Sequence, residues 1–567
     1  MKMPDYTADL IVNNANIHTV NSDAPKAQSF AVKNGKFVAV GTNSDTKMLS
    51  GENTKIWDLK GYTVIPGFID AHIHVLSSGS RHVMAADCDL RSISDVQEAL
   101  KRRAAKTEPG QWVQGFKYDD TKIKENRDLY RQDLDSISLD HPIMVSHRAG
   151  HVYYMNSKAL ELSGYHNESE DPHGGKLGRD KSTGELNGVV YERAIQPTQQ
   201  LLPRISDKDR TEGLKQISSM LNSSGLTSVH DARVSKDEFS TYQDGEKNNY
   251  LGLRVYMLMA QDLFPSLRDA GVKTGFGSEM LKVGGIKMTS DGAIAARTAW
   301  LSEPYIGSED DCGIQAMSQE ELDDQVIQMH NAGFQVAVHA NGDSAISMVL
   351  NSYEKALDLN PLKDTRHRIE HCTLVNPDIL KRMAKNDVQA TPFCTYVFYH
   401  GEKMQFYGEE RLEWMFAQKS FIEYGVNSTG ATDYPPGPYP PLMGIQSCIT
   451  RTDSNGKLWG PSQKINIDQA LKIYTLNGAK AAFEENIKGS ISMNKLADFV
   501  VLDKDITKVE LPRHIKITKD DGTGHTLATL GIFGFSGAEA MAGGDDVVAI
   551  SNQKNTYSGA GQDTDEG

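Results

Sequence analysis

Two histidines spaced one residue apart, His72 and His74, end an apolar stretch that begins at Val64. Residues i and i+2 of a β-strand point to the same face, so both imidazoles aim at one point at the carboxyl end of the expected strand. Converging imidazoles are typical ligands of catalytic zinc. Two unrelated polar residues at a strand end are the structural alternative, and only ligands elsewhere in the chain can decide between the two.

Side chains able to bind a metal or move a proton end several other apolar stretches. These are Lys287, His339, His371 and Asp433. One histidine at a strand end is more often packed than ligating. Several such groups are harder to explain by packing if their strands open at one mouth, as they do in a barrel. Three or four imidazoles with one carboxylate match the preferences of zinc, and other divalent metals stay open.

Lys287 has two readings. A charged amine inside a barrel is costly unless it is paired or neutral. The structural reading is an ion pair with Asp291, four residues further on. The functional reading is a carbamate formed with CO2, an anion able to bridge two metals. The metal content would therefore be one or two ions per chain.

The segment that must position these residues alternates apolar strands with helical patterns between residues 62 and 485, which is typical of parallel βαβ units. The first predicted strand ends at His74, and seven follow: 225–231, 253–259, 285–289, 334–339, 367–371, 387–392 and 426–433. Eight such units predict a closed (β/α)8 TIM barrel, an α/β fold. An open doubly wound sheet is the rival, but no Gly-rich phosphate loop follows the first strand.

The two ends of the chain and one long insertion complete the expected organisation. Short apolar segments with turn pairs such as Asn34-Gly35 predict antiparallel hairpins in residues 1–61. We expect residues 486–550 to complete a composite β-sandwich with them, and 526–535 and 545–550 to add edge strands. Residues 80–210 predict an inserted subdomain that grows from the loop after barrel strand 1 and overhangs the mouth. The composition of 551–567 predicts a disordered tail.

Composition excludes several classes of partner. The 567-residue chain carries a net charge of -15, which argues against nucleic acid because phosphate binding needs a basic surface. No apolar run approaches the roughly 20 residues of a membrane helix. Its five scattered cysteines form no CxxC motif, which favours a reduced, cytoplasmic location. We expect a small-molecule substrate and leave a homodimer open.

The motifs together resemble the amidohydrolase superfamily, specifically its amidohydrolase-3 branch, the YtcJ-like and N-substituted formamide deformylase group. The matching stretches are VIPGFIDAHIHV, GHVYYMNSKAL, DPHGGKLGRD, GLTSVHDA, GGIKMTSDGAIAARTAWLSEPY, VAVHANGD, RIEHC and ATDYP. The resemblance covers about residues 8 to 510. It implies a (β/α)8 barrel with a composite β-sandwich and an inserted domain.

The resemblance also implies a role for each predicted ligand. His72, His74 and Asp433 would bind the first metal, and His339 and His371 the second. Lys287 would be the carboxylated bridge between them. Asp433 would also shuttle the proton while a metal-activated hydroxide attacks the substrate.

Residues around the predicted mouth complete the hypothesis. Candidates for substrate contact are Tyr118, Asp119, His151, Asn156, Arg297, Thr298 and Tyr434. For each of them, surface or packing duty is an equal alternative. We expect His230 and Asp231 to form supporting bonds to a ligand histidine, as metal sites need, and Asp291 to orient the Lys287 loop.

The leading function is hydrolysis of a C–N bond of the amide or N-formyl type. Deamination of an amine-bearing ring is the nearest alternative and would need one metal and no bridging lysine. Ester or carbamate hydrolysis stays open. A regulatory protein that keeps the barrel without catalysis is a different class, and an intact set of ligands with Asp433 argues against it.

Overall fold

A computed structural model describes residues 7–148, 150, 152–508 and 532–535 of the chain. The apolar stretch before His72 and His74 is two strands rather than one, β7 (Thr63–Pro66) and β8 (Phe68–Ile73). Gly67 separates them. A Cβ atom at this position would lie 2.1 Å from Thr227 Oγ1, so only glycine fits where the chain passes from one sheet to the other.

Seven parallel strands form the central sheet, in the order β20-β19-β18-β17-β16-β15-β8. Their bounds beyond β8 are β15 (Leu226–Val234), β16 (Arg254–Ala260), β17 (Leu281–Thr289), β18 (Gln335–Ala340), β19 (Arg368–His371) and β20 (Gln389–Thr391). Chain order and spatial order agree, as expected for successive right-handed βα units. The predicted (β/α)8 class is thus supported as a TIM-like barrel.

The eighth predicted strand, 426–433, is not a continuous strand. It forms single parallel bridges at Ser428 and Ala431 toward the β20 side. On its other side Ala71 N–H donates to Gly430 O (2.9 Å) and Asp433 N–H donates to His72 O (2.9 Å). Residues 428–433 therefore lie between β20 and β8, and the count of eight strands stays a prediction.

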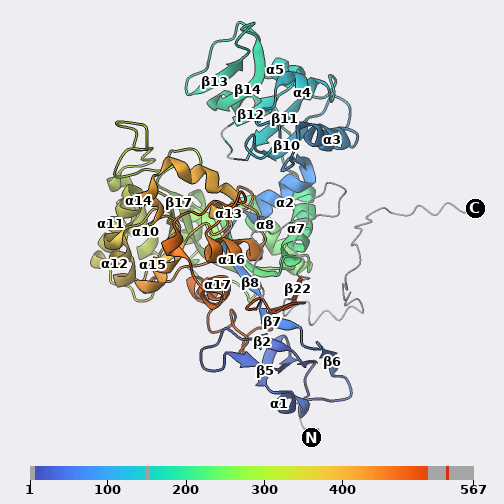
Figure 1. Ribbon diagram of the computed structural model, residues 1–567, viewed down its shortest axis with the longest axis vertical. Helices are drawn as coiled ribbons and strands as arrows, with labels where there is room; N and C mark the ends of the chain where they lie inside the picture. The colour runs from blue at the N-terminus through green and yellow to red at the C-terminus, as the bar shows by residue number, and fades with distance from the viewer. Residues whose placement is uncertain (1–6, 149, 151, 509–531, 536–567) are drawn as a thin grey trace, which may run out of the picture.

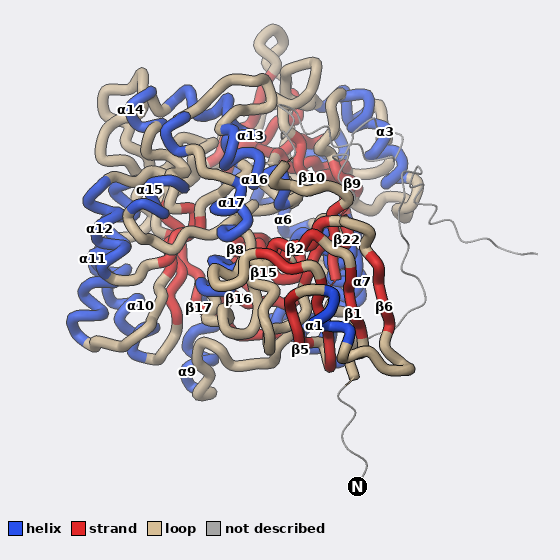
Figure 2. Tube along the Cα trace, turned by 60° about the horizontal axis from the view of Figure 1, so that its bottom comes forward, coloured by secondary structure: helices blue, strands red, loops and turns tan. Residues whose placement is uncertain are grey.

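Helices cover the outside of this sheet, as α10 to α12 show in Figure 2. Those in the barrel region are α2 (Val75–Met84), α7 (Asp207–Asn222), α8 (Lys236–Lys247), α9 (Phe264–Asp269), α10 (Gln319–Asn331), α11 (Asp343–Leu359), α12 (Pro377–Lys385), α13 (Tyr396–His400), α14 (Glu409–Leu412), α15 (Gln418–Glu423), α16 (Pro441–Thr450), α17 (Ile467–Ile473) and α18 (Leu476–Ala481). Most of these helices pack their apolar faces on the strands in one large buried core, while α13 and α14 belong to a second cluster. That core holds the strand ends in place.

Two further sheets are built mostly from the first part of the chain, one of them also includes two strands from near its end, and we call both the terminal sheets. Their strands are β1 (Leu10–Asn13), β2 (Asn16–His18), β3 (Lys26–Ala27), β4 (Ser29–Lys33), β5 (Lys36–Gly41), β6 (Lys55–Asp58), β7, β21 (Phe499–Leu502) and β22 (Ile532–Phe535), with α1 (Asn43–Lys47) beside them. The predicted antiparallel pairing is only partly right. β1 pairs in parallel with β6, and β2 with β7, so the sheets are mixed. β21 pairs antiparallel with both β7 and β22.

A six-stranded sheet, β13-β14-β12-β11-β10-β9, forms what we call the inserted subdomain, residues 85–192. Its elements are β9 (Ala85–Asp87), α3 (Ile93–Ala104), β10 (Val113–Tyr118), α4 (Arg131–Asp135), β11 (Ile143–His147), β12 (Val152–Met155), α5 (Ser157–Leu162), β13 (Gly175–Arg179) and β14 (Leu186–Glu192), and α6 (Gln196–Leu201) follows. Figure 1 shows it at one end of the molecule, with the terminal sheets at the other and the barrel between. The predicted boundaries between these parts stay predictions.

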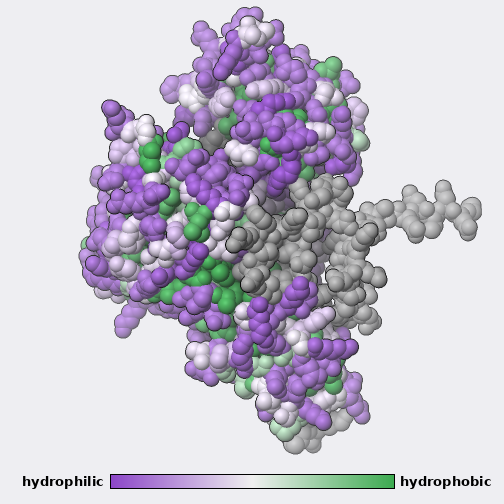
Figure 3. Space-filling view, in the orientation of Figure 1, coloured by the Kyte–Doolittle hydropathy of each residue, from purple (hydrophilic) through white to green (hydrophobic). Residues whose placement is uncertain are grey.

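The surface seen in Figure 3 is mostly hydrophilic, with a hydrophobic patch near α17. No helix of the described ranges is both long and apolar enough to cross a bilayer. Of the predicted edge strand 526–535, residues 532–535 form β22 and residues 526–531 lie outside the described residues. The stretch 545–550 and the predicted disordered tail, 551–567, lie outside the described residues.

Candidate metal centre

Three predicted ligands converge where β8 ends. The ligand atoms of His72, His74 and Asp433 all lie within 4.8 Å of one another. The Nε2 atoms of His72 and His74 are 3.5 and 3.3 Å from Asp433 Oδ1. The His72 side chain is fully buried, whereas the His74 side chain is 31% exposed to solvent. Two imidazoles and a carboxylate form the kind of open half-site that catalytic metals occupy.

The hydrogen bonds of His72 leave one lone pair free. Its Nδ1 is bonded to Glu370 Oε2. Burial alone would raise the pKa of Glu370, but Arg368 and His72 hold it far below its ordinary range, so Glu370 is a carboxylate and only accepts. His72 Nδ1 therefore carries the proton. His72 Nε2 is buried without a hydrogen-bond partner among the described residues, and such a directed lone pair fits a metal ion.

Asp433 is held in its ionised form. Burial would raise its pKa, but the close imidazoles of His72, His74 and His371 hold the pKa well below the usual value. The Asp433 side chain is only 16% exposed. A buried, ionised carboxylate beside two imidazoles can bind a cation and can accept a proton.

His371 and His339 complete a ring of imidazoles. The His371 ring centroid lies 4.7 Å from that of His72 and 4.4 Å from that of His339. His339 Nε2 donates to Gly292 O (3.0 Å), which leaves its Nδ1 as the acceptor. Burial lowers the pKa of His339 to about 4 and that of His371 well below its ordinary value. Both rings are thus neutral, the form that binds metals.

Lys287 lies on β17 and is buried, with 7% of its surface exposed. Burial lowers the pKa of its amine, although Glu370 and Asp433 act in the opposite direction. No ion pair joins Lys287 to Asp291 within the part of the chain that the structure describes, so the structural reading of Lys287 finds no support. Asp291 instead accepts the N–H groups of Trp300, Asn341 and Gly342 (2.9–3.0 Å).

Backbone strain accompanies two of the predicted ligands. His371 has a φ of 69° and Asp433 a φ of 51°, both in the left-handed region. Each such residue costs on the order of 1–3 kcal/mol and persists only where the surrounding structure imposes it. The fold therefore loses some stability in directing these two side chains toward the mouth.

The predicted supporting residues act indirectly. His230 Nδ1 accepts from Arg368 (2.8 Å), and Arg368 in turn binds Glu370, so His230 reaches His72 only through two side chains. Asp231 accepts the N–H groups of Val75 and Leu76 (3.1 and 3.4 Å). It thereby fixes the first turn of α2, directly after His74. Asp291 holds the start of α11 and lies 3.4 Å from His339 Nε2.

Sequence reasoning missed three buried residues that orient the ligands. Glu370 and Arg368 form a two-point ion pair behind His72 (2.7 and 3.1 Å). Asp70 accepts the N–H groups of His72 and Thr432 (3.1 and 3.2 Å) and ties the two ligand-bearing segments together. The Arg-x-Glu spacing of Arg368 and Glu370 within a predicted barrel strand was the available signal, because such charges are buried only when paired.

Two predicted substrate contacts belong to the interior of the inserted subdomain instead. The hydroxyl of Tyr118 donates to Arg127 O (2.6 Å), and its ring packs on Tyr154. Asn156 caps α5 by accepting from Ala159 N–H (2.9 Å) and donates to two carbonyls nearby. Both side chains are fully buried, so neither faces the mouth.

The other predicted substrate contacts differ in their exposure and in their partners. Tyr434 is buried, and its hydroxyl lies between His82 Nε2 and Lys117 Nζ. Arg297 is exposed and stacks on Phe406 (5.0 Å). Thr298 Oγ1 accepts from Ala293 N–H (2.9 Å) and closes its own loop. His151 lies outside the described residues.

Asp119 belongs to a second group of acids and histidine, Asp119, Asp120 and His147, whose ligand atoms also lie within 4.8 Å of one another. Its charges are matched within the protein. His147 Nε2 is 3.2 Å from Asp120 Oδ1, and Arg148 Nε is 3.8 Å from Asp119 Oδ2. A guanidinium so close supplies the positive charge that a metal would bring, so this group is an ion-pair network.

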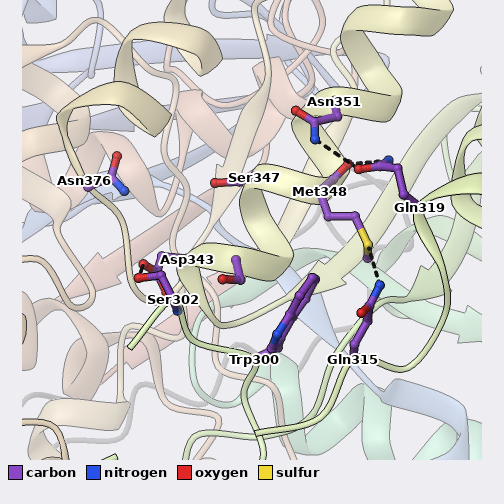
Figure 4. Close-up of a pocket in the computed structure, with 10 residues that line it drawn as sticks. Trp300, Ser302, Gln315, Gln319, Asp343, Ser347, Met348, Asn351 and Asn376 are labelled. Atoms are coloured by element: carbon purple, nitrogen blue, oxygen red, sulfur yellow. Dashed lines mark hydrogen bonds between the residues drawn. The ribbon is translucent and has the colours of Figure 1, made fainter. Parts of the chain in front are cut away.

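A cavity of about 330 Å³ opens beside the start of α11 (Figure 4). Trp300, Met348 and amide side chains such as Gln315 and Asn351 line it, and none of the predicted ligands does. Gln319 and Asn351 are hydrogen-bonded to each other across its wall (3.0 Å). Its polar groups largely satisfy one another, which favours a structural groove over a catalytic pocket.

The sequence profile of the amidohydrolase family matches residues 55–527 of the chain. The chain belongs to the amidohydrolase family. This amidohydrolase is 29% identical over 516 residues to N-substituted formamide deformylase of Arthrobacter pascens, across 88% of this chain and 94% of that protein. It is 30% identical to the protein LONG AFTER FAR-RED 3 of Arabidopsis thaliana, across 87% of each chain. A solved structure, an uncharacterized metal-dependent hydrolase from Pyrococcus furiosus, aligns with a TM-score of 0.72 at 26% identity and covers 88% of this chain and 100% of that one.

Proposed function

We propose that this amidohydrolase is a metal-dependent hydrolase that cuts a C–N bond, of the amide or N-formyl type, in a small molecule. The observation that carries the proposal is the buried, unpartnered Nε2 of His72 beside His74 and Asp433. A folded protein rarely leaves a buried polar atom without a partner unless a ligand or ion completes it. The donor set of imidazoles with one carboxylate favours zinc.

His72, His74 and Asp433 would hold one metal, and His339 and His371 a second. A bound divalent metal would supply a Lewis acid and lower the pKa of water toward about 7. Lys287 would join the two halves as a carbamate. Its buried position supports this, because a neutral amine is the form that reacts with CO2 and burial lowers the pKa of the lysine.

Asp433 would move the proton in this reaction. Its low pKa keeps the carboxylate ionised before catalysis, so it can accept a proton from the attacking water. The same carboxylate would pass the proton to the leaving nitrogen, which departs as an amine. Because Asp433 lies within 3.5 Å of both histidines, one side chain could serve at the metal and at the scissile bond.

The proposed bond type rests on similarity to a known protein and not on the geometry of the site. N-substituted formamide deformylase aligns with 88% of this chain, and its name describes removal of a formyl group from nitrogen. An N-formyl or other amide substrate is therefore the first to test. Deamination of an amine-bearing ring and ester or carbamate hydrolysis are kept as outcomes of the same test.

The test combines metal analysis with a substrate panel. We expect one or two zinc ions per chain, release of formate from N-substituted formamides, loss of this activity on chelation and its return with zinc. Asp433→Asn should lower kcat by about 10²–10⁴-fold, the range of a lost acid–base group. Asp120→Asn, in the ion-pair network described above, is the matched control and should leave both zinc and kcat unchanged.

Three results would contradict this function. Ammonia release from amine-bearing rings with one metal per chain would make the protein a deaminase. If Asp120→Asn lost its zinc while His72→Asn kept it, the metal would lie at Asp119, Asp120 and His147 instead. A zinc-loaded chain that turns over no member of the panel would favour a protein without catalysis.

A further inference from the structure

The loop that follows Asp433 has few means of holding itself in place. Its sequence is Tyr434-Pro435-Pro436-Gly437-Pro438. Proline has no N–H group, so this backbone offers carbonyl acceptors and almost no donors. Donors from elsewhere in the molecule must therefore fix the loop, and with it the position of the Asp433 carboxylate.

Arg148 of the inserted subdomain supplies such donors. Its Nη1 donates to Pro435 O (3.1 Å) and to Pro436 O (3.0 Å). Its Nη2 lies 2.6 Å from Asp89 Oδ2, and the guanidinium lies 4.9 Å from the ring centre of Tyr399. The Arg148 side chain is only 3% exposed. Burying a guanidinium is costly unless it is paired, and Asp89 of the subdomain supplies the pairing carboxylate that keeps this donor at the loop.

A lysine could not replace Arg148 here. The planar guanidinium reaches two carbonyls from one nitrogen while another nitrogen faces Asp89, a fixed fork that a single ammonium does not reproduce. His400 Nε2 donates to Pro436 O as well (3.1 Å). Three hydrogen bonds thus converge on two successive proline carbonyls, two and three residues after Asp433.

The subdomain also contacts Tyr434, the residue next to Asp433. The Tyr434 hydroxyl is bonded to His82 Nε2 of α2, and Lys117 Nζ of the subdomain lies 3.4 Å from it. Lys117 is paired with Asp87 Oδ2 (2.6 Å). Lys117 has a φ of 66° at an irregularity in β10, and such bulges re-aim a side chain. The strand is therefore distorted where it turns Lys117 toward Tyr434.

We propose that Arg148 is a positioning residue for Asp433, and that the inserted subdomain sets the geometry of the metal centre through the proline loop. This rests on the proposed function, in which Asp433 binds metal and moves a proton. Arg148 contacts neither the predicted ligands nor, in this proposal, the substrate. It acts through backbone carbonyls, and a shift of about 1 Å in a catalytic group can cost about 10²-fold in rate.

The test compares Arg148→Met with Arg254→Met. Arg254 is an equally buried arginine, 5% exposed and bound at two points to Asp498 (2.7 and 3.0 Å), and it lies on β16, away from the loop. Both variants remove a buried ion pair, so both should lower the melting temperature. Only Arg148→Met should increase amide hydrogen exchange in a peptide covering residues 430–438, because only it releases that loop.

Two functional readouts accompany the exchange measurement. With zinc saturating, Arg148→Met should lower kcat by about 30- to 100-fold and leave KM within about threefold, since the substrate is not contacted. Zinc affinity, measured by competition with a chelator, should fall by about tenfold, the range for residues that orient a ligand. Arg254→Met should change neither quantity more than about twofold.

Each outcome decides the proposal. Faster exchange in the loop without a change in kcat or zinc affinity would overturn it, and so would equal losses in both variants. If Arg148→Met does not fold, Arg148→Lys keeps the charge and should give the same pattern at about a third of the size; wild-type values in that variant would overturn it. A wild-type chain that binds no zinc and cuts no substrate would reject the proposed function, while the exchange data would still report whether Arg148 holds the loop.

Discussion

Strand β19 carries a histidine at each end, and the two are used in opposite ways. His367 precedes the strand at its amino end. Its Nδ1 accepts from Val336 N–H (3.0 Å), its Nε2 pairs with His330 Nδ1 (3.0 Å), and His330 Nε2 donates to Asn360 O (2.7 Å). His371 ends the strand at the mouth, and no hydrogen bond reaches its ring nitrogens within the described part of the chain.

Charge does not separate these two histidines. Burial lowers the pKa of His367 to about 3 and that of His371 well below its ordinary value, so both are neutral at pH 7. What differs is the hydrogen bonding: every ring nitrogen of His330 and His367 is bonded, while no hydrogen bond reaches those of His371 among the described residues. A barrel keeps stability at its amino end and chemistry at its carboxyl end, and β19 shows how hydrogen bonding divides the two roles.

The largest expected effect comes from swapping each histidine for asparagine. His371→Asn should lower kcat/KM by about 10³-fold, corresponding to the loss of about 4 kcal/mol of metal-assisted stabilisation of the transition state. Its stability should hold, because asparagine tolerates the left-handed φ of 69° at this position. His367→Asn should keep activity within about twofold and lower the free energy of unfolding by about 1–3 kcal/mol. Kinetics and urea unfolding of the two variants measure both quantities.

The comparison would break if the effects were exchanged. A zinc-loaded His371→Asn enzyme with full activity, or a His367→Asn enzyme that loses zinc while staying folded, would show that free lone pairs do not mark the functional end.

Strand β17 offers the next contrast, between Lys287 near the mouth and Lys282 near the other end. Lys287→Ala should weaken zinc binding by about 10- to 100-fold, and acetate or propionate should restore part of it by replacing the carbamate. Lys282 is paired with Glu484 (2.8 Å). Lys282→Ala should leave zinc affinity unchanged and be insensitive to carboxylic acids. Isothermal titration with zinc, with and without the acids, distinguishes the two; identical binding in Lys287→Ala and wild type would remove the bridging role.

Much of the fold could be predicted because the strands of a parallel barrel are apolar stretches that alternate with helical patterns along the chain. Seven of the predicted barrel strands are present, each within a few residues of its expected position. The change of sheet at Gly67 was missed, although the dipeptide Pro66-Gly67 often marks a turn. Parallel pairing of β6 was missed because hairpin turns suggest only antiparallel neighbours.

The residues of the candidate site also differ in whether they could be predicted. Residues at strand ends, such as His72, His371 and Asp433, could be predicted because strand direction fixes where they meet. Residues on the inserted subdomain could not, since loop geometry decides them. Tyr118 and Asn156 are interior residues there, whereas Arg148, which the sequence did not single out, reaches the loop after Asp433.

A further expected effect is on the pH dependence of stability. The unfolded chain protonates His367 near pH 6.5, and the folded chain does so only near 3, so the unfolded state binds more protons between these values. The stability contributed by this neutral histidine is full above pH 6.5 and is lost as pH falls toward 3, by up to about 1.4 kcal/mol per pH unit. Urea unfolding of zinc-free wild type and His367→Asn at several pH values should show a shallower acid loss in the variant. If wild type and His367→Asn lost stability at the same rate as pH falls, His367 would not be held neutral in the folded state.

The pairing of β7 with β21 has a consequence for how the protein is made. Pro66 lies opposite Phe499, so the sheet that leads directly into β8 and His72 joins residues from near the two ends of the chain. A ribosome adds about 5–20 residues per second, so β7 waits on the order of half a minute or more for its partner to emerge. The strand that leads into the metal centre is thus made well before the strand that completes its sheet, and the edge of β7 that faces β21 stays unpaired until then.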